Sequence, residues 1–195
     1  MVKDEFLKQF APMIVAEARA RGYIYPSAIL AQAACESNWN RSELSRYYYN
    51  YFGMKCGSYW KGKSVNMKTK EEYVLGCVVA IKDNFRVYDS PVEGIRGYFD
   101  FISMKRYSNL RWASSPIDYI QKLKWDGWAT SSKYIKTLTD IIYQNGLTIY
   151  DMAGHVAQEV IDGLWGVGEE RKQRLEKAGY NYRMVQDIVN YMVKM

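Results

Sequence analysis

The sequence predicts a mainly helical α+β protein with two parts, a larger helical domain and a small C-terminal module. Apolar residues recur at helical spacing over most of the chain, and prolines or glycines bracket several of these segments. Between about residues 50 and 90, glycines instead separate short segments rich in β-branched residues. This second pattern favours a small, irregular β region between the helices.

The expected helices fall into two groups. The first group comprises residues 4–21, 26–36, 91–104, 116–124 and 132–145. The second group comprises three short amphipathic stretches, residues 156–163, 168–178 and 182–193. Because the helical pattern lapses over residues 148–155, we place a domain boundary at about residue 150. The expected domains are therefore residues 1–150 and 151–195.

The excess positive charge lies in the first domain. The formal net charge is +6, and residues 155–195 hold 6 of the 27 Lys and Arg and 6 of the 21 Asp and Glu. The C-terminal module is therefore neutral. A basic body favours a polyanionic partner, which could be nucleic acid, an anionic membrane or an anionic cell wall.

Several classes of protein are disfavoured by composition. No apolar run reaches the roughly 18 residues that span a bilayer, and acids interrupt the N-terminal segment where a signal peptide has its apolar core. Cys35, Cys56 and Cys77 lack metal-ligand spacing, and the single histidine, His155, lies in an apparent linker. We expect free thiols, synthesis in the cytoplasm, and no metal, cofactor or Ser-His-Asp site.

Glu36 ends the second expected helix, PSAILAQAACE, whose other residues are nearly all apolar. Burial of such a helix removes water from the carboxylate, and the helix dipole disfavours an anion at this end. Both effects are expected to raise the pKa of Glu36, which suits a general acid near neutral pH. The alternative is a capping glutamate or one that is salt-bridged to Arg41 or Arg46.

The stretch AILAQAACESNWNRSELSRYYYNYFGMK resembles the catalytic signature of glycoside hydrolase family 73. The resemblance continues through TKEEYVLGC and WDGWATSSKYIKTLTDIIYQNGL and covers about residues 5–148. It implies a lysozyme-like helical domain with a β lobe. It also implies an endo-β-N-acetylglucosaminidase that cleaves the β-1,4 bond between GlcNAc and MurNAc in peptidoglycan, with Glu36 as the general acid.

The resemblance implies a second carboxylate in the β lobe. Glu72 is the favoured candidate, because it has the motif's spacing counted back from Gly76. Counting forward from Thr69 gives Glu71 instead, so Glu71 stays open. If this carboxylate activates water, the anomeric configuration inverts. If the substrate's 2-acetamido group attacks instead, the configuration is retained, and both routes stay open.

The resemblance also implies a set of substrate contacts. These residues are Phe52, Gly53, Trp128 and Tyr134. Tyr88 and Tyr98 fit the same family pattern, and we expect both to pack inside the domain. Many relatives carry an acidic residue just before the position of Tyr98, where this chain has Gly97.

The C-terminal segment VAQEVIDGLWGVGEERKQRLEKAGYNYRMVQDIVNYM resembles the three-helix wall-binding repeat of some phage lysozymes. This second resemblance implies binding to the cell wall. Trp165 and Tyr180 could form a platform for a sugar ring, and Arg171 could pair with a muropeptide carboxylate. The alternative is that both rings form the core of the small bundle.

The two resemblances together indicate a phage endolysin. We expect bacterial peptidoglycan as the partner, a monomer, no nucleic acid and no stable membrane insertion. The protein would act on the wall after leaving the host cytoplasm through a separate pore. The rival functions are a muramidase or lytic transglycosylase, which cut the bond on the MurNAc side, and a non-catalytic wall-binding or nucleic-acid-binding protein.

Overall fold

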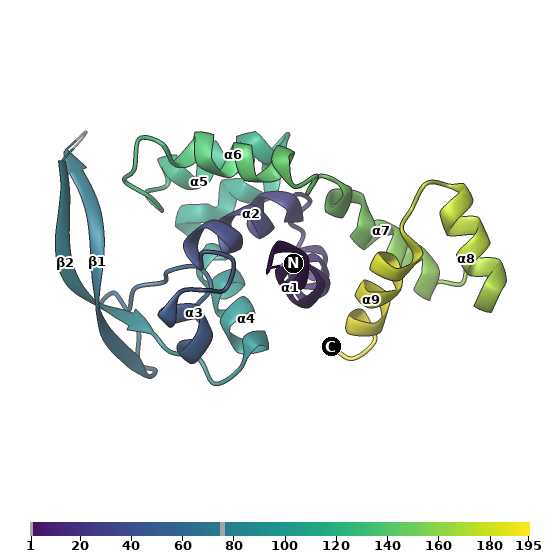
Figure 1. The fold of residues 1–195 in the computed structure, drawn as a ribbon, viewed down its shortest axis with the longest axis horizontal. Coiled ribbons are helices and arrows are strands. Elements are labelled where there is room, and N and C mark those ends of the chain that lie inside the picture. Colours follow the sequence, from purple (N-terminus) through teal and green to yellow (C-terminus); the bar gives the residue numbers. More distant parts are fainter. Residues whose placement is uncertain (1, 75–76) are drawn as a thin grey trace.

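The computed structural model describes residues 2–74 and 77–195, and the side chains of residues 70–79 lie outside the described part. In these ranges the helices are α1 (Val2–Ala20), α2 (Pro26–Glu36), α3 (Glu43–Tyr48), α4 (Pro91–Ile102), α5 (Pro116–Trp125), α6 (Tyr134–Gln144), α7 (Ile149–Ile161), α8 (Gly168–Lys177) and α9 (Tyr182–Met192). A 3-10 helix, η1, covers Lys105–Trp112. The strands are β1 (Ser64–Val74) and β2 (Cys77–Arg86). This architecture confirms the predicted mainly helical fold with a small β lobe (Figure 1).

The prediction of a linker over residues 148–155 was wrong, because α7 runs through it. Small and apolar residues of α7, among them Tyr150, Ala153 and Ala157, recur at helical spacing and are buried. Two short elements, α3 and η1, were also not predicted. Ser42 starts α3 by accepting a hydrogen bond from the backbone N–H of Ser45.

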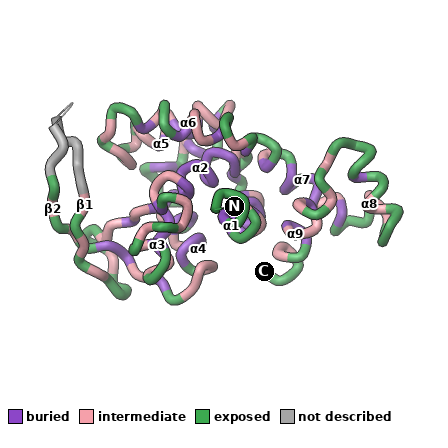
Figure 2. Tube along the Cα trace, in the orientation of Figure 1, coloured by how far each residue is buried: buried purple, intermediate pink, exposed green. Residues whose placement is uncertain are grey.

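Helix α1 lies at the centre of the molecule, between α2 and α4 on one side and α7 and α9 on the other (Figure 1). Its buried residues are distributed around most of its circumference: Phe6, Phe10, Ala11, Met13, Ile14, Val15, Ala16, Glu17 and Ala18. Helix α2 packs against α1, and Figure 2 shows α2 as buried along most of its length. Val185, Ile188 and Val189 of α9 belong to the same continuous core. The C-terminal helices therefore share a core with the rest of the chain.

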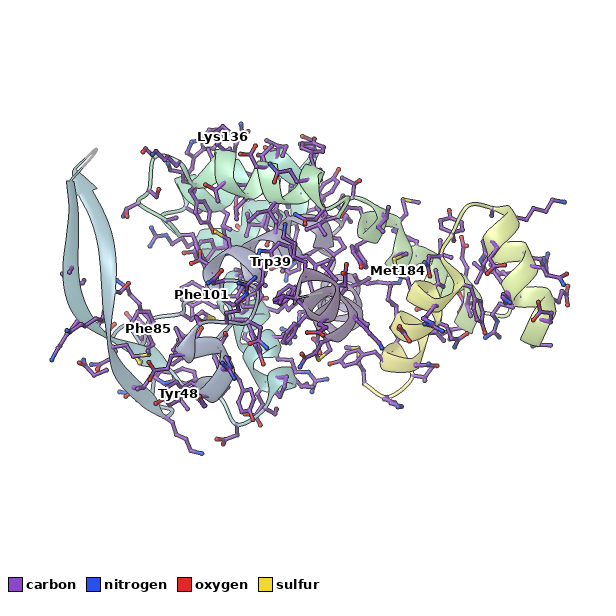
Figure 3. All side chains as sticks on the ribbon, viewed as in Figure 1. Trp39, Tyr48, Phe85, Phe101, Lys136 and Met184 are labelled. Carbon is purple, nitrogen blue, oxygen red and sulfur yellow. The ribbon has the colours of Figure 1, made fainter. Side chains whose placement is uncertain are left out.

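A two-stranded antiparallel hairpin forms the β lobe, at the end of the molecule opposite the C-terminal helices (Figure 1). Its register pairs Ser64 with Arg86 and Lys68 with Lys82. A bridge between Lys55 and Phe85 attaches the preceding segment to the base of β2. Phe85, labelled in Figure 3, is buried where the hairpin joins the body. The β region is thus more regular than the glycine pattern predicted.

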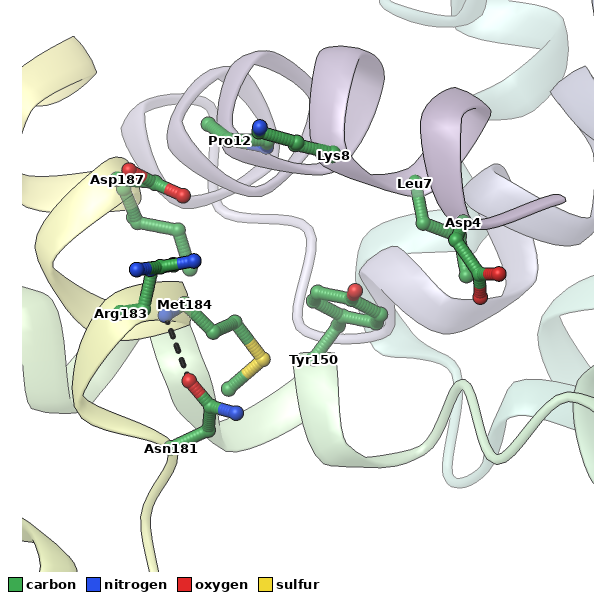
Figure 4. Close-up of a pocket in the computed structure, with 10 residues that line it drawn as sticks. Asp4, Leu7, Lys8, Pro12, Tyr150, Asn181, Arg183, Met184 and Asp187 are labelled. Atoms are coloured by element: carbon green, nitrogen blue, oxygen red, sulfur yellow. Dashed lines mark hydrogen bonds between the residues drawn. The ribbon is translucent and has the colours of Figure 1, made fainter. Parts of the chain in front are cut away.

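A cavity of about 430 Å³ lies between α1 and α9 (Figure 4). Helix α1 contributes Leu7, Lys8 and Pro12 to its lining. Tyr150 of α7 and Arg183 and Asp187 of α9 also line it. The two helices therefore pack closely only over part of their length. Among the described residues, no helix combines the length and the apolar character that a bilayer crossing requires.

Candidate active site

Glu36 is the last residue of α2, as predicted. Residues 26–34 of this helix are all buried, whereas Glu36 is partly exposed. The helix starts at Pro26 without a side-chain cap from Tyr25. Instead, Asp151 of α7 accepts hydrogen bonds from the Ser27 backbone N–H (2.9 Å) and hydroxyl (2.8 Å). A carboxylate from another helix therefore caps the helix that carries Glu36.

A left-handed turn follows Glu36 directly. Asn38, Trp39 and Asn40 have φ angles of 50°, 58° and 60°. The Ser37 hydroxyl donates to the Ala33 carbonyl (2.6 Å) and accepts from the Asn40 N–H (2.9 Å), which holds the turn together. Three successive non-glycine residues in this region are unusual, and such strain persists where the surrounding structure imposes it.

Three groups from other segments surround the Glu36 carboxylate. The Tyr134 hydroxyl donates to Oε1 at 3.2 Å, and the Trp128 indole N–H donates to the same oxygen at 3.4 Å. On the other side, a Cβ at Gly53 would lie 3.4 Å from Oε2. The end of α2, the loop before the hairpin, the turn after α5 and the start of α6 therefore meet at one carboxylate.

Tyr134 is held in its protonated form. Burial raises its pKa well above the usual 10, and the negative charge of Glu36 adds to the increase. The hydroxyl is therefore protonated at neutral pH and can donate a hydrogen bond to the carboxylate. Cys35, the neighbour of Glu36, behaves similarly, because burial and the Glu36 charge raise its pKa to about 12. A protonated, buried thiol is a poor nucleophile.

Asn50 sets the shape of the loop that contains Gly53. Its side-chain N–H groups donate to the carbonyls of Met54 and Arg86, each at 2.9 Å. Its side-chain oxygen accepts from the Met54 N–H at 2.8 Å. Gly53 adopts a positive φ of 64°, which suits glycine. Asn50 therefore joins the Gly53 loop to the end of the hairpin.

The predicted substrate contacts divide into two groups. Gly53, Trp128 and Tyr134 lie around Glu36, as described above. Phe52 does not, because its ring is 1% exposed and stacks on Tyr98 with centroids 3.8 Å apart. The Phe52 ring therefore packs in the core beneath the loop, where a sugar cannot contact it. The two candidates for the second carboxylate, Glu71 and Glu72, have side chains outside the described residues.

The missing acid at Gly97 has a steric explanation. A Cβ at this position would lie 2.4 Å from Cε1 of Tyr88, so the Tyr88 ring fills the space that a side chain would need. Tyr88 is 8% exposed and Tyr98 is 0% exposed, which confirms that both pack inside the domain.

In the C-terminal helices, the three predicted wall-binding residues make contacts within the repeat. The Trp165 indole N–H donates to Glu159 at 2.9 Å, and its ring meets Tyr180 edge-to-face at 5.8 Å. Arg171 donates from Nε to the Gly166 carbonyl (3.1 Å) and from Nη1 to the side-chain oxygen of Gln186 (3.2 Å). The two rings therefore do not form a shared flat platform.

No alternative chemistry is visible in the described part of the chain. His155 lies on α7, where its ring nitrogen pairs with Arg19 at 3.0 Å, and it has no carboxylate or hydroxyl partner for a catalytic triad. Among the described residues, no group of three or more His, Cys, Asp or Glu could hold a metal ion.

Sequence reasoning missed the left-handed turn and the neighbours of Tyr98. Asn38 and Asn40 were a usable signal, because asparagine tolerates the left-handed region better than other non-glycine residues. No local signal indicates that Tyr119 of α5 places its hydroxyl 2.9 Å from that of Tyr98.

Comparison with known proteins shows the family to which the chain belongs. A model of the family described as mannosyl-glycoprotein endo-beta-N-acetylglucosaminidase, Glucosaminidase, matches residues 11–147, and a model of the CW_7 repeat matches residues 154–193. The peptidoglycan hydrolase FlgJ of Escherichia coli (strain K12) is 36% identical over 121 residues, which are 60% of this chain and 38% of FlgJ. A probable N-acetylmuramidase of Lactococcus lactis subsp. cremoris is 35% identical over 158 residues, 77% of this chain and 35% of that protein.

A solved structure shares the fold as well as the sequence pattern. The crystal structure of a peptidoglycan hydrolase mutant from Sphingomonas sp. A1 superposes with a TM-score of 0.66 at 29% identity, covering 76% of this chain and 97% of that one. The chain spans well under half the length of the two curated relatives above. On the family match over residues 11–147, the chain belongs to the glucosaminidase family, glycoside hydrolase family 73, and it carries a CW_7 repeat.

Proposed function

We propose that this chain hydrolyses peptidoglycan as an endo-β-N-acetylglucosaminidase, cutting the β-1,4 bond between GlcNAc and MurNAc with Glu36 as the general acid. One observation carries the proposal: a partly exposed carboxylate at the end of a buried helix receives hydrogen bonds from Trp128 and Tyr134. This arrangement fixes the orientation of a titratable group, which acid catalysis requires.

The two oxygens of Glu36 have different surroundings. Oε1 accepts both aromatic hydrogen bonds, so the proton to be transferred would sit on Oε2, beside Gly53. In the first step this proton moves to the glycosidic oxygen as the bond from that oxygen to the GlcNAc C1 breaks. The leaving MurNAc then carries the proton as a hydroxyl, and Glu36 is left as a carboxylate.

The same step needs an attacking group that bonds to C1 as the glycosidic oxygen leaves. Glu72 would act as the base that activates water, and in that case its carboxyl should lie roughly 6.5–9.5 Å from that of Glu36. Glu71 is the alternative base, and the substrate's acetamido oxygen is the alternative nucleophile. Proton NMR of the first product formed separates inversion from retention. Strong loss of activity in Glu72→Gln with little loss in Glu71→Gln would assign Glu72 as the base. The reverse result would assign Glu71.

The substrate class rests on the relatives. FlgJ is named as a peptidoglycan hydrolase, and the family model concerns endo-β-N-acetylglucosaminidases. A muramidase is the second candidate, because the Lactococcus lactis relative is named as a probable N-acetylmuramidase at a similar identity of 35%. The two activities cut opposite bonds of the same glycan.

Mass spectrometry of digested cell walls, with assignment of the new reducing ends, decides between these activities. The proposal predicts GlcNAc at the reducing ends. New MurNAc ends would identify a muramidase, and anhydro-MurNAc would identify a lytic transglycosylase. An absence of any soluble product would favour a non-catalytic wall-binding protein.

We further propose that the repeat holds the enzyme on the wall. Tyr180 borders a cavity of about 550 Å³ that is also lined by Lys172 and Arg183, so it is better placed for a ligand than Trp165 or Arg171. The net charge of +6 adds attraction to anionic wall polymers, which salt would screen. Co-sedimentation with purified walls should fall in Tyr180→Ala, and unchanged binding would remove this residue from the proposal.

The biological setting that fits these parts is a phage endolysin, active as a monomer, that meets the wall after crossing the membrane through a separate pore. Expression in host cells with and without a co-expressed pore protein tests this. Lysis should require the pore, and lysis without it would contradict the proposed route.

A further inference from the structure

Tyr98 of α4 contacts Trp128, which donates a hydrogen bond to Glu36, and it also contacts Phe52 and Gln32, which lie near the site along the chain. Its side chain is 0% exposed. Its ring stacks on Phe52, with centroids 3.8 Å apart and planes at 15°, and meets Trp128 edge-on at 5.4 Å. Its hydroxyl donates to the side-chain oxygen of Gln32 at 2.7 Å.

Each of these contacts leads to Glu36 by a short path. Phe52 precedes Gly53, which lies beside Oε2, and Trp128 donates its indole N–H to Oε1. Gln32 stands four residues before Glu36, one turn earlier on α2. The ring of Tyr98 therefore fixes the two walls of the carboxylate site, and its hydroxyl fixes the last turn of α2.

The Tyr98 hydroxyl also belongs to a buried chain of hydrogen bonds. It lies 2.9 Å from the hydroxyl of Tyr119, so the chain joins α2, α4 and α5. Gln32 is 0% exposed, and within the described residues its side-chain NH2 group has no hydrogen-bond partner. A buried amide that leaves a donor unsatisfied costs stability, so the hydrogen bond that Gln32 accepts from Tyr98 is the described contact that holds this side chain.

We propose that Tyr98 is a positioning residue for Glu36: it holds Trp128 and the Gly53 loop through its ring, and the end of α2 through Gln32. The proposal rests on the proposed role of Glu36 as the general acid. A residue that only packs would change the stability of the protein alone. A positioning residue also changes kcat and the pH dependence of the reaction.

Two substitutions separate the ring from the hydroxyl. Tyr98→Leu removes the stack on Phe52 and the contact with Trp128, whereas Tyr98→Phe removes only the hydrogen bonds to Gln32 and Tyr119. With soluble peptidoglycan fragments as substrate, kcat should fall at least about tenfold in Tyr98→Leu and about threefold in Tyr98→Phe, with KM changed less than about twofold. The loss should appear in kcat because the substrate does not touch Tyr98.

The pH–rate profile gives the second readout. When Trp128 is no longer held, it donates less well to Glu36, and a carboxylate that loses a donor holds its proton more tightly. The basic limb of the kcat profile should therefore move to higher pH in Tyr98→Leu. Trp128→Phe should produce the same shift, and combining the two substitutions should add little, because both act on one hydrogen bond.

Tyr150→Leu is the matched control. Tyr150 is a buried tyrosine of α7, 9% exposed, that lines the α1–α9 cavity and has none of the contacts above. It should lower the melting temperature and leave kcat and the pH profile unchanged below the melting transition. If Tyr98→Leu behaves in the same way, the proposal is wrong. If Tyr98→Leu does not fold, an unchanged kcat in Tyr98→Phe would equally overturn it.

Glu36→Gln, measured in parallel, separates this proposal from the function on which it rests. Full activity in Glu36→Gln would end the proposed function itself. An inactive Glu36→Gln together with a fully active Tyr98→Leu would end only the positioning role of Tyr98.

Discussion

The site around Glu36 and the C-terminal repeat use their aromatic side chains in opposite ways. In the body, Trp128 and Tyr134 direct an N–H and an O–H at one partly exposed carboxylate. In the repeat, Trp165 donates its N–H to Glu159, and its ring packs edge-on against Tyr180. Trp128 and Tyr134 thus serve a reactive group, whereas Trp165 packs inside the repeat and only Tyr180 also borders a cavity.

Size accounts for this difference. The body has a large core in which rings such as Phe10, Phe99 and Tyr119 are fully buried, so other aromatic residues can face the site. The repeat spans residues 154–193, which is close to the lower limit for a domain that folds alone. Such a bundle needs its large side chains for its own stability, and it also relies on α1 as a neighbour.

Removal of residues 155–195 should have the largest effect on stability. Deletion exposes the face of α1 that α9 covers and discards Val185, Ile188 and Val189 from the shared core. Each fully buried side chain of this kind contributes about 1.5–3 kcal/mol. Since domains are stable by only about 5–15 kcal/mol, the truncated chain should melt far below the full chain in circular dichroism. An equally stable, active truncation would instead establish an independent module.

Tyr134→Phe should reduce kcat by roughly 10- to 100-fold, because it removes a hydroxyl that donates to Glu36. The matched control is Tyr143→Phe on the same helix, where the side chain is 64% exposed. Initial rates with soluble peptidoglycan fragments provide the measurement. Equal rates for the two variants would remove Tyr134 from the site and weaken the contrast with the repeat.

Trp165→Leu should destabilise the repeat, by about 1–2 kcal/mol, through loss of the contacts with Glu159 and Tyr180. Trp112→Leu, at a tryptophan that is 82% exposed, is the control and should be nearly neutral. Urea unfolding measures both. If Trp165→Leu keeps full stability but loses binding to purified walls, the ring is a ligand platform and the contrast drawn above fails.

A similarly small effect is expected at Asp151, which joins the two regions. Burial raises its pKa from 3.8 to about 6, despite the hydrogen bonds from Ser27. The folded protein therefore binds this proton more tightly than the unfolded chain. The contribution of this bound proton to the stability of the fold is complete below about pH 4 and is lost as the pH rises through 6.

Asp151→Asn removes this titration. Melting temperatures at pH 4 and pH 7.5 should show the variant gaining stability relative to the unmodified chain as the pH rises. The gain should be about 1–2 kcal/mol, which is less than the roughly 3 kcal/mol of an unscreened shift, because Asp151 is only partly buried. A constant difference between the two proteins across this range would mean that Asp151 keeps an ordinary pKa.

The sequence predicted the fold and part of the site for identifiable reasons. PSAILAQAACE is an apolar helical run with a proline start, so the place of Glu36 at the end of a buried helix followed from local rules. Trp128 and Tyr134 were assigned only through the family resemblance, since they follow Glu36 by 92 and 98 residues. Such contacts depend on tertiary packing, which periodicity does not encode.

The errors have physical causes too. Phe52 shares a motif with Gly53, so both were expected at the substrate. Neighbouring positions on a loop can face in different directions, and the Phe52 ring lies in the core against Tyr98. The glycine and polar residues of TIYDMAGH weaken the helical pattern, so the start of α7 was not predicted. Packing on α1 stabilises this helix. At Gly154 a Cβ would already lie 3.1 Å from Val15, so a small residue suits that close approach.

The most direct test of the central claim is the turnover of Glu36→Gln on purified peptidoglycan, followed by mass spectrometry beside the unmodified chain. Glutamine keeps the shape of the side chain and its acceptor oxygen but has no acidic proton to transfer. We predict new GlcNAc reducing ends for the unmodified chain and at least a roughly 1,000-fold lower rate for a folded Glu36→Gln protein. Comparable product yields from the two proteins would contradict the assignment of Glu36 as the acid.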